Sequence, residues 1–412
     1  MNIFAIKAIP SSNIVPMKIK LLPDTIETES EAWAIGTNES AKRISVLVSG
    51  KGDGNEWDSK RLIHLIMRLA SMKLPFTIFE DTKMDQMEVG VIGAGKITER
   101  IHIPILLEYP KTIVKYVADI DIDRANKLAK ICGCDAIEVE EEIEKLPECD
   151  IVLLAMPVGV RKPYIELFSR RETPIFVENP FAKNIEDHQE FVGLNNKMVC
   201  NYMRTWFSST KQMREIVRSE LFGPLKNVRI QEGLVNSLGM GKKHYRNDIR
   251  LAGGGVLMES GCHTISQIVD ILEGYDITVK KSDIMWKDEL DVAVEVVMVA
   301  SKDSDVKIEY RASRVESFEA EAEFEFQNVK IRFDHTGSNE RLRVHVEGMN
   351  GPLIIESGRY ATSFGEGVFL KWAEFIQQIN SEGEMNTDQM TGIKVTEVIT
   401  GIYKKAKGGI KI

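Results

Sequence analysis

The sequence has few cysteines, no excess of positive charge and no long apolar run, and each absence speaks against a class of protein. Its five cysteines among 412 residues are odd in number and scattered, unlike the pattern of a disulfide-rich secreted domain. Lys and Arg number 53 against 62 Asp and Glu, and the net charge of −9 disfavours nucleic acid and anionic membrane as partners. No segment approaches the ~20 apolar residues that cross a bilayer, and Met1–Lys7 lacks the basic start of a signal peptide. We therefore expect a soluble, cytoplasmic protein.

The closest cysteine pair is Cys132 and Cys134, which are separated by a single glycine. Zinc sites usually have wider spacing within a pair and a second pair of ligands nearby, and the sequence offers neither. We interpret this segment as a turn after a helix and predict no metal site.

Residues 1–87 form an opening block with several proline and glycine turn signals. Residues 43–48 are typical of a strand, residues 59–73 carry apolar side chains at helical spacing, and residues 76–79 are again strand-like. The pattern predicts an additional N-terminal α/β block, for which the sequence indicates no role.

Residues 88–205 alternate more regularly. Strands are expected at 88–92, 113–118, 150–155 and 174–177, with helices at 124–131 and 163–169. This alternation predicts an α/β domain built on a doubly wound parallel sheet.

From residue 206 to 412 the pattern changes to long strands, and a second α/β domain is predicted. In one strand Phe318, Phe324 and Phe326 alternate strictly with Glu319 and Glu325, so one face is apolar and the other charged. We expect an open, mainly antiparallel sheet covered by helices on one face, with closing helices at 369–379 and 392–407.

A glycine-rich turn follows the first strand of the parallel sheet: Gly93, Gly95, Lys96 and Ile97 belong to a dinucleotide fingerprint whose third glycine is replaced by Thr98. The first glycine permits the tight turn, and the second lets the backbone approach a pyrophosphate at the helix N-terminus. The next strand ends at Asp119, whose carboxylate would bind the adenosine ribose and repel a 2′-phosphate. The motif therefore predicts NAD in preference to NADP.

Further motifs follow in a characteristic order: VGVIGAGKI (89–97), VAD (117–119), DIVLLAMP (150–157), VENPFA (177–182), YRND (245–248), GGGVLMESGCH (253–263) and VITGIY (398–403). In these motifs residues 88–407 resemble the glucose–fructose oxidoreductase/inositol dehydrogenase (Gfo/Idh/MocA) family of oxidoreductases. The resemblance implies a Rossmann domain followed by an α/β domain whose open sheet often serves oligomer contact.

Two departures from the family concern the expected catalytic residues. The family's Glu-Lys-Pro motif places a lysine beside nicotinamide and substrate, and here that position is Asn179, whose amide cannot take up a proton. The family's Asp-x-x-x-His pair becomes Glu259 and His263. The resemblance implies that His263 is the general base, that Glu259 orients it or balances its charge, and that Asn179 hydrogen-bonds nearby.

Two further positions are notable. Arg161 stands where the family commonly has another histidine. Lys183 is a candidate to replace the missing lysine, although a solvent-facing position suits it better.

The resemblance also implies the lining of the pocket. Met156, Pro157 and Glu178 would border the nicotinamide, and Arg204, Tyr245 and Arg246 would line the substrate side, although both arginines also suit a surface position. A basic stretch at 242–244 would favour an anionic substrate if it reached the pocket.

Three functions are compatible with these residues. The first is an NAD-dependent oxidoreductase that transfers hydride to or from a hydroxyl or keto carbon of a sugar, cyclitol or nucleotide sugar. The second is a non-catalytic NAD-binding regulator or scaffold that lost its lysine at Asn179. The third retains NAD and uses transient oxidation for epimerisation or elimination. A homo-oligomer formed through the open sheet is expected in each case.

Overall fold

The computed structural model describes residues 2–7, 17–18, 31–32, 43–48, 86–109, 111–139, 142–194, 197–235, 244–337, 341–348, 350–356, 360–361, 363–380 and 386–406. The chain divides into two compact units, one comprising Met1–Gln86 with Gly358–Tyr360 and the other comprising the rest.

In the first unit, β1 (Asn2–Lys7) pairs antiparallel with β4 (Arg43–Val48), and β2 (Met17–Lys18) pairs with β3 (Glu31–Ala32). The strand predicted at 43–48 is confirmed. The helix expected at 59–73 and the strand expected at 76–79 lie outside the described residues.

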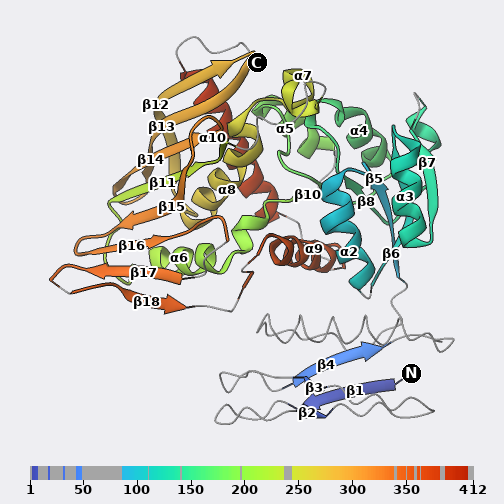
Figure 1. Cartoon of the computed structure of the whole chain (residues 1–412), viewed down its shortest axis with the longest axis horizontal. Helices are drawn as coiled ribbons and strands as arrows, with labels where there is room; N and C mark the ends of the chain where they lie inside the picture. The colour runs from blue at the N-terminus through green and yellow to red at the C-terminus, as the bar shows by residue number, and fades with distance from the viewer. Residues whose placement is uncertain are drawn as a thin grey trace. The chain divides into compact units, whose positions relative to one another are not determined.

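The second unit contains a six-stranded parallel sheet in the order β10-β9-β8-β5-β6-β7 (Figure 1). Its strands are β5 (Met87–Ile92), β6 (Thr112–Asp119), β7 (Asp135–Glu138), β8 (Ile151–Leu154), β9 (Ile175–Val177) and β10 (Met198–Cys200). All four residues of β8 are fully buried, as expected of a strand covered on both faces. The order of connection reverses between β5 and β8, and the carboxyl ends of the strands at such a point form the usual ligand crevice.

Helices connect these strands. They are the π-helical turn η1 (Thr98–His102) that continues into α2 (Ile103–Glu108), then α3 (Ile122–Cys132), α4 (Lys162–Arg170) and α5 (Ile185–Leu194), with the short turns η2 (Ile143–Lys145) and η3 (Val158–Val160). Local signals explain the ends of α3: the Asp121 carboxylate accepts a hydrogen bond from the backbone N–H of Arg124, and Gly133 ends the helix with φ of 69°.

An eight-stranded sheet follows in the order β12-β13-β14-β11-β15-β16-β17-β18, antiparallel except for the parallel pair β11–β14. The strands are β11 (Asn227–Gly233), β12 (Asp276–Lys287), β13 (Leu290–Ser301), β14 (Asp305–Ser313), β15 (Phe318–Glu325), β16 (Val329–Phe333), β17 (Arg341–Val346) and β18 (Leu353–Glu356). The helical elements of this region are η4 (Met203–Trp206), α6 (Ser208–Arg218), η6 (Tyr245–Asn247), α7 (Ile249–Ala252), η7 (Leu257–Gly261), α8 (Cys262–Ile271), α9 (Phe364–Asn380) and α10 (Asn386–Lys405).

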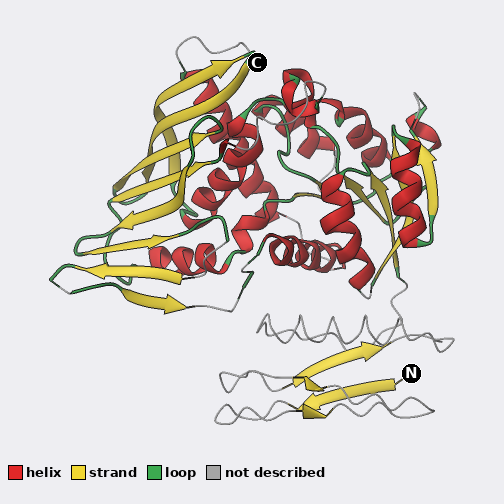
Figure 2. Cartoon of the chain, viewed as in Figure 1, coloured by secondary structure: helices red, strands yellow, loops and turns green. Residues whose placement is uncertain are grey.

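The two faces of this sheet differ as the alternation predicts. Phe324 and Phe326 are buried, and each contributes about 2–3 kcal/mol of burial free energy. On the other face Glu323 forms ion pairs with Arg229 and Arg332. Figure 2 shows α6, α8 and α10 on one side of the sheet. The predicted fold class, a parallel doubly wound sheet followed by a mainly antiparallel one, is confirmed, whereas the domain boundary near residue 205 stays a prediction because both sheets belong to one compact unit.

Helix α8 is buried along its whole length, and apart from Nδ1 of His263 its polar side chains have partners within the protein. Thr264 donates to Glu232, Gln267 donates to Thr210 and to the carbonyl of His335, and Ser266 donates to the carbonyl of His263. Burial with satisfied hydrogen bonds makes α8 a rigid support for His263. Among the described helices, none has the length and apolar character needed to cross a membrane.

His188 on α5 provides a test of this packing. Its ring stacks on Phe181, its Nδ1 lies 2.7 Å from Thr396 Oγ1 on α10, and burial lowers its pKa to about 3. The unfolded chain binds a proton here below about pH 6.5 and the folded protein does not, so stability falls as the pH drops. Urea titrations should show that His188→Gln removes about 2 kcal/mol of the stability loss between pH 7 and pH 5. Thr396→Val removes the contact but keeps the buried imidazole, so its stability should still fall between pH 7 and pH 5. If the stability of His188→Gln fell as much over this range as that of the original protein, the assignment would be wrong.

Candidate dinucleotide and active site

The turn after β5 is closed by backbone contacts that require glycine at its first position. Gly93 has φ of 102°, and a Cβ there would lie 2.3 Å from the carbonyl oxygen of Ala155. Its N–H donates to the Ala118 carbonyl at 2.8 Å, and its own carbonyl accepts from Thr98 Oγ1 at 2.5 Å. Thr98, at the position of the missing third glycine, therefore stabilises the turn from within the helix.

Gly95 faces open space. A Cβ at Gly95 would meet no atom within 4 Å, and the helical run 96–108 begins at the next residue. The Lys96 side chain is exposed and Ile97 is half-buried. An uncovered backbone at a helix N-terminus is the arrangement that accommodates a pyrophosphate.

Asp119 lies beside this turn at the end of β6. One carboxylate oxygen accepts from the Ala94 N–H at 2.6 Å and the other from the Asp121 N–H at 2.9 Å. Each oxygen keeps a lone pair for a ribose hydroxyl. The nearby Arg124 guanidinium pairs with Asp121 at 3.0 Å. The open backbone and this carboxylate fit a nicotinamide dinucleotide, and both lie at the carboxyl edge of the parallel sheet.

Arg161 fixes the two loops that border the expected nicotinamide position. This fully buried guanidinium donates to the carbonyls of Met156 at 2.8 Å, Pro180 at 2.5 Å and Phe181 at 3.1 Å. Burial lowers its pKa to about 10, so it remains a cation at neutral pH. Arg161 thus joins the Met156–Pro157 loop to the Asn179–Pro180 loop, a role that its position in the sequence did not indicate.

Glu178 is buried at the end of β9 and accepts hydrogen bonds from three side chains. His102 Nε2 and Asn201 Nδ2 each lie 2.6 Å from Oε1, and Asn179 Nδ2 lies 3.4 Å from Oε2. His102 is in turn bound by Trp372, whose indole N–H donates to Nδ1 at 3.0 Å. The Glu178 carboxylate therefore faces the interior, and its expected place beside the nicotinamide stays a prediction.

Asn179 and His263 contact each other directly. Asn179 Nδ2 lies 3.1 Å from His263 Nε2, and Asn179 Oδ1 accepts from the Cys262 thiol at 3.1 Å. Because Glu178 can only accept and Cys262 donates, the amide NH₂ points toward Glu178 and His263. His263 Nε2 is then an acceptor and Nδ1 carries the proton. Burial, reinforced by the Arg204 cation, holds the pKa of His263 well below its usual range, so the imidazole is neutral.

Glu259 is bound to arginines instead of to His263. Its carboxylate pairs with Arg246 at 2.5 Å and with the buried Arg314. The segment that carries it is held by the buried Asp291, which accepts from the backbone N–H groups of Gly255 and Leu257. The expectation that Glu259 orients His263 receives no support from a direct contact, and its catalytic role stays a prediction.

Arg204 also has an internal partner. Its guanidinium lies 3.2 Å from Glu232 and 3.3 Å from the Thr264 hydroxyl, with only 12% of the side chain exposed. The surface alternative considered for Arg204 is therefore wrong, and its expected contact with substrate stays a prediction.

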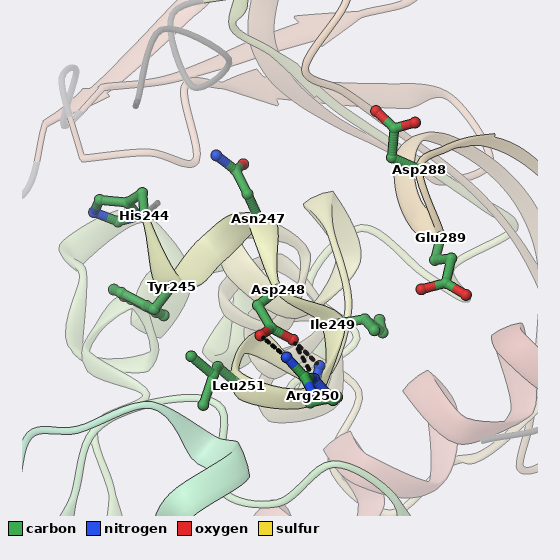
Figure 3. Close-up of a pocket in the computed structure, with 9 residues that line it drawn as sticks. All are labelled: His244, Tyr245, Asn247, Asp248, Ile249, Arg250, Leu251, Asp288 and Glu289. Atoms are coloured by element: carbon green, nitrogen blue, oxygen red, sulfur yellow. Dashed lines mark hydrogen bonds and ion pairs between the residues drawn. The ribbon is translucent and has the colours of Figure 1, made fainter. Parts of the chain in front are cut away.

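A groove of about 460 Å³ lies over η6 and α7 (Figure 3). Its wall consists of His244, Tyr245 and residues 247–251, with Asp288 and Glu289 of the β12–β13 turn opposite. Asp248 and Arg250 neutralise each other at 2.7 Å, so the remaining formal charge of these residues is acidic. The groove adjoins the site through Tyr245, whose hydroxyl accepts from Arg246 at 3.3 Å. Lys242 and Lys243 lie outside the described residues.

Sequence reasoning missed several residues that organise the site, namely His102, Trp372, Asn201, Asp291 and Arg314. None lies in a fingerprint; for His102, the helical spacing from Thr98 places both side chains on the buried face of one helix, which is the available signal. Lys183 is half-buried, and its Cγ would lie 3.1 Å from a Cβ at Gly253. Over the described residues, no three His, Cys, Asp or Glu side chains gather as a metal site would require.

Comparison with known proteins agrees with this geometry. A family model described as an oxidoreductase family with an NAD-binding Rossmann fold, Gfo/Idh/MocA, matches residues 87–204. A dTDP-3,4-didehydro-2,6-dideoxy-alpha-D-glucose 3-reductase of Streptomyces antibioticus is 22% identical over 191 residues, which cover 45% of this chain and 57% of that protein. An inositol 2-dehydrogenase of Rubrobacter xylanophilus is 24% identical over 148 residues, covering 34% of this chain and 42% of that protein. The matched part of the chain thus spans 57% of the first of these curated relatives and 42% of the second.

Solved structures share the whole two-sheet fold. A 3-ketoreductase from Actinomadura kijaniata, crystallised with NADP and TDP-benzene, has a TM-score of 0.68 at 14% identity, covering 78% of this chain and 98% of its own. A levoglucosan dehydrogenase in complex with NADH and levoglucosan has a TM-score of 0.68 at 14% identity, with coverage of 78% and 97%. These similarities establish the fold.

The open space at Gly95 provides a direct test of the dinucleotide site. Gly95→Ala should leave the free energy of unfolding within about 0.5 kcal/mol of the original, because the new methyl group meets no atom, and should weaken NAD binding about tenfold or more by filling the pyrophosphate position. Calorimetric titration measures the affinity. Gly193→Ala, which also meets nothing within 4 Å but lies on α5, is the matched control. Equal affinity in the two variants would place the dinucleotide elsewhere.

Proposed function

Because residues 87–204 match the model of the Gfo/Idh/MocA family of NAD-binding oxidoreductases, we propose that this chain is an NAD-dependent oxidoreductase acting on a hydroxyl or keto carbon of a sugar or cyclitol. The main support is the contact between Asn179 and His263 at 3.1 Å, at the same sheet edge as the open glycine turn. The glycine turn and the Asn179 loop thus follow strands of one sheet, and Asn179 contacts the neutral imidazole of His263 on α8.

The proposed mechanism assigns a role to each of these residues. Gly93 and Gly95 would hold the pyrophosphate, and Asp119 would hold the adenosine ribose, while Arg161 keeps the Met156 and Asn179 loops in place. The bound nicotinamide would supply hydride transfer. His263 would accept the substrate's hydroxyl proton at Nε2 after that hydroxyl replaces the Asn179 amide, and would return it in the reverse direction. Asn179 would orient the substrate or the nicotinamide carboxamide without exchanging a proton.

The choice of NAD over NADP rests on Asp119. A carboxylate binds the two ribose hydroxyls and repels a 2′-phosphate, and the neighbouring Arg124 is occupied by Asp121. The solved relative with NADP leaves this choice open at the level of the family, so the preference is a property proposed for this chain.

The substrate class follows from the pairing of the arginines. Arg204 faces Glu232 and Arg246 faces Glu259, so a substrate phosphate would have to compete with carboxylates of the chain itself. The acidic wall opposite Tyr245 adds to this effect. We therefore favour an uncharged sugar or cyclitol over a nucleotide-linked sugar, and retain Arg204, Tyr245 and Arg246 as the expected substrate side.

One observation favours the second function, an NAD-binding regulator. The Asn179 amide is engaged by Glu178, His263 and Cys262 at once, as expected if the site has become a fixed structural element. A homo-oligomer through the outer face of the eight-stranded sheet and a location in the cytoplasm remain proposals under either function.

Replacing Asn179 by lysine distinguishes the two functions. If the chain is an active oxidoreductase, it reduces NAD measurably with some member of a polyol panel, and Asn179→Lys should raise that turnover about 100-fold, the usual contribution of a positioned acid–base group. The measurement is the absorbance of NADH. Asn179→Gln, which keeps an amide, is the control and should not increase turnover. Absence of activity in the original chain together with its appearance in Asn179→Lys would support the regulator instead.

Asp119 should set the cofactor preference. Asp119→Asn should shift the ratio of NADP to NAD affinity toward NADP by about tenfold, since the repelling charge is gone. Titration with both dinucleotides measures the ratio. Asp123→Asn removes the same charge from the first turn of α3 and should leave the ratio unchanged. An original chain that binds NADP more tightly than NAD would overturn the proposal.

A further inference from the structure

The groove over η6 and α7 has two walls, and both are anchored to segments of the candidate active site. The first wall consists of α7 with Tyr245. It packs so closely on the η3 loop that a Cβ at Gly159 would lie 1.8 Å from the carbonyl oxygen of Arg250. This loop directly follows Met156 and Pro157, which are expected to border the nicotinamide. The position of the first wall is therefore fixed by the dinucleotide side of the site.

The second wall is the turn between β12 and β13, which carries Asp288 and Glu289 (Figure 3). Two residues after this turn, the buried Asp291 accepts a hydrogen bond from the backbone N–H of Leu257 at 2.7 Å. Leu257 begins η7, which continues into α8 with His263. The second wall is thus anchored to the segment that carries the neutral imidazole, and the groove is a fixed extension of the site.

Asp288 and Glu289 have backbone conformations that other residues adopt more easily. Their φ angles are 49° and 68°, in the left-handed region that a two-residue hairpin turn usually fills with asparagine and glycine. Both side chains are exposed, and within the part of the chain that the structure describes neither carboxylate has a hydrogen-bond or ion-pair partner. The turn therefore presents two unpaired anions, at positions where uncharged residues would suit the backbone better.

The first wall offers an aromatic surface. Tyr245 is 39% exposed, and the ring of His244 lies beside it with the centroids 4.8 Å apart. Burial and the Arg246 cation hold the pKa of His244 below its usual range, so this ring is uncharged at neutral pH. Arg250 binds both oxygens of Asp248, at 2.7 and 3.0 Å. Among the lining residues the groove thus combines an exposed aromatic ring with two carboxylate acceptors and no unpaired cation.

These groups match a ring that is apolar on its face and hydroxylated at its edge. The C–H face of a pyranose or cyclitol can stack on Tyr245, while its hydroxyls donate charge-assisted hydrogen bonds to Asp288 and Glu289. The volume of about 460 Å³ lies in the range of small-molecule sites and is larger than a lone ammonium group would fill. A phosphate or carboxylate on the ligand would be repelled by the two anions.

We propose that this groove is a second carbohydrate subsite, which binds the non-reacting ring of an uncharged disaccharide or glycoside while the reacting ring lies at the Asn179–His263 contact. The inference rests on the proposed function for the reacting ring and deepens it by naming the substrate class. Because the groove takes a part of the substrate that does not react, the second ring should add binding free energy without altering the chemical step.

The first experiment measures sugar binding by saturation-transfer NMR, on the protein alone and again with NADH, which cannot accept hydride from a hydroxyl compound. The probes are maltose, cellobiose, lactose and trehalose, compared with glucose, galactose, glucosamine and myo-inositol. At least one disaccharide should bind about tenfold more tightly than its monosaccharides, because both rings are then held.

A double variant of the turn identifies the groove as the source of this gain. Asp288→Asn/Glu289→Gly should bind the preferred disaccharide no more tightly than the monosaccharides. Its melting temperature should be unchanged or higher, because asparagine and glycine suit the turn, so the loss of affinity would not reflect unfolding. Asp303→Asn removes an exposed charge between β13 and β14 and is the control; it should bind the disaccharide as the original chain does.

Turnover with the preferred disaccharide provides the functional result. The double variant should raise KM about tenfold, and the effect should lie in KM and not in kcat, since uniform binding of a distant ring affects KM alone. Tyr245→Ala should raise KM in the same way, whereas Tyr245→Phe retains the stacking ring and should retain a low KM. A merely structural role for the turn would change the reaction of monosaccharides to the same extent.

The outcomes separate this inference from the proposed function. Disaccharides that bind no more tightly than monosaccharides, or full disaccharide affinity in the double variant, would overturn the subsite. A preference for glucosamine over every neutral sugar would also overturn it, because the carboxylates would then recognise a cation. Disaccharide binding that depends on the turn, without NAD binding or turnover, would support the subsite and contradict the oxidoreductase proposal.

Discussion

A buried carboxylate, that of Glu178, is the constraint on which the rest of the site depends. Burying an anion is costly unless several donors compensate it, and here His102, Asn201 and Asn179 do so. His102 lies at the end of η1, Asn201 follows β10, and Asn179 lies in the loop after β9. One charge therefore holds three segments of the chain together, and Asn179 has little freedom to adopt another orientation.

Two further buried ions hold the loops around it. Arg161 gathers the carbonyls of Met156, Pro180 and Phe181, and Asp291 holds the N–H groups at the start of η7. Because breaking such contacts would leave an uncompensated buried charge, the loops are fixed before any ligand arrives. Asn179, at the position where the resemblance predicts a lysine, lies within this rigid frame, so the difference concerns the chemistry available at the site and not the fold.

The fold was predictable because its signals are local: apolar strands alternating with helices, together with the glycine turn, predicted the parallel sheet, and the Phe/Glu alternation of β15 predicted the one-sided sheet. Strands without such signals, β7, β10, β12 and β18, were not foreseen. For the candidate site, the glycine turn, Asp119 and the neighbouring positions of Asn179 and His263 were foreseen. The arginine partners of Glu259 were not foreseen, because Arg314 comes from a distant loop. The contact between Trp372 and His102 was not foreseen either, because the two residues are 270 positions apart in the sequence. Contacts between residues that are far apart in the sequence produce no periodic pattern from which they could be predicted.

The central claim is that NAD lies on the glycine turn and extends to the Asn179–His263 contact. Hydrogen–deuterium exchange with and without NAD tests it most directly, because it reports on each loop separately and needs no substrate. The account predicts slower exchange at residues 93–102, 155–161 and 178–183 when NAD is added, with the outer strands of the eight-stranded sheet unchanged. Unaltered exchange in these three segments at saturating NAD would contradict it.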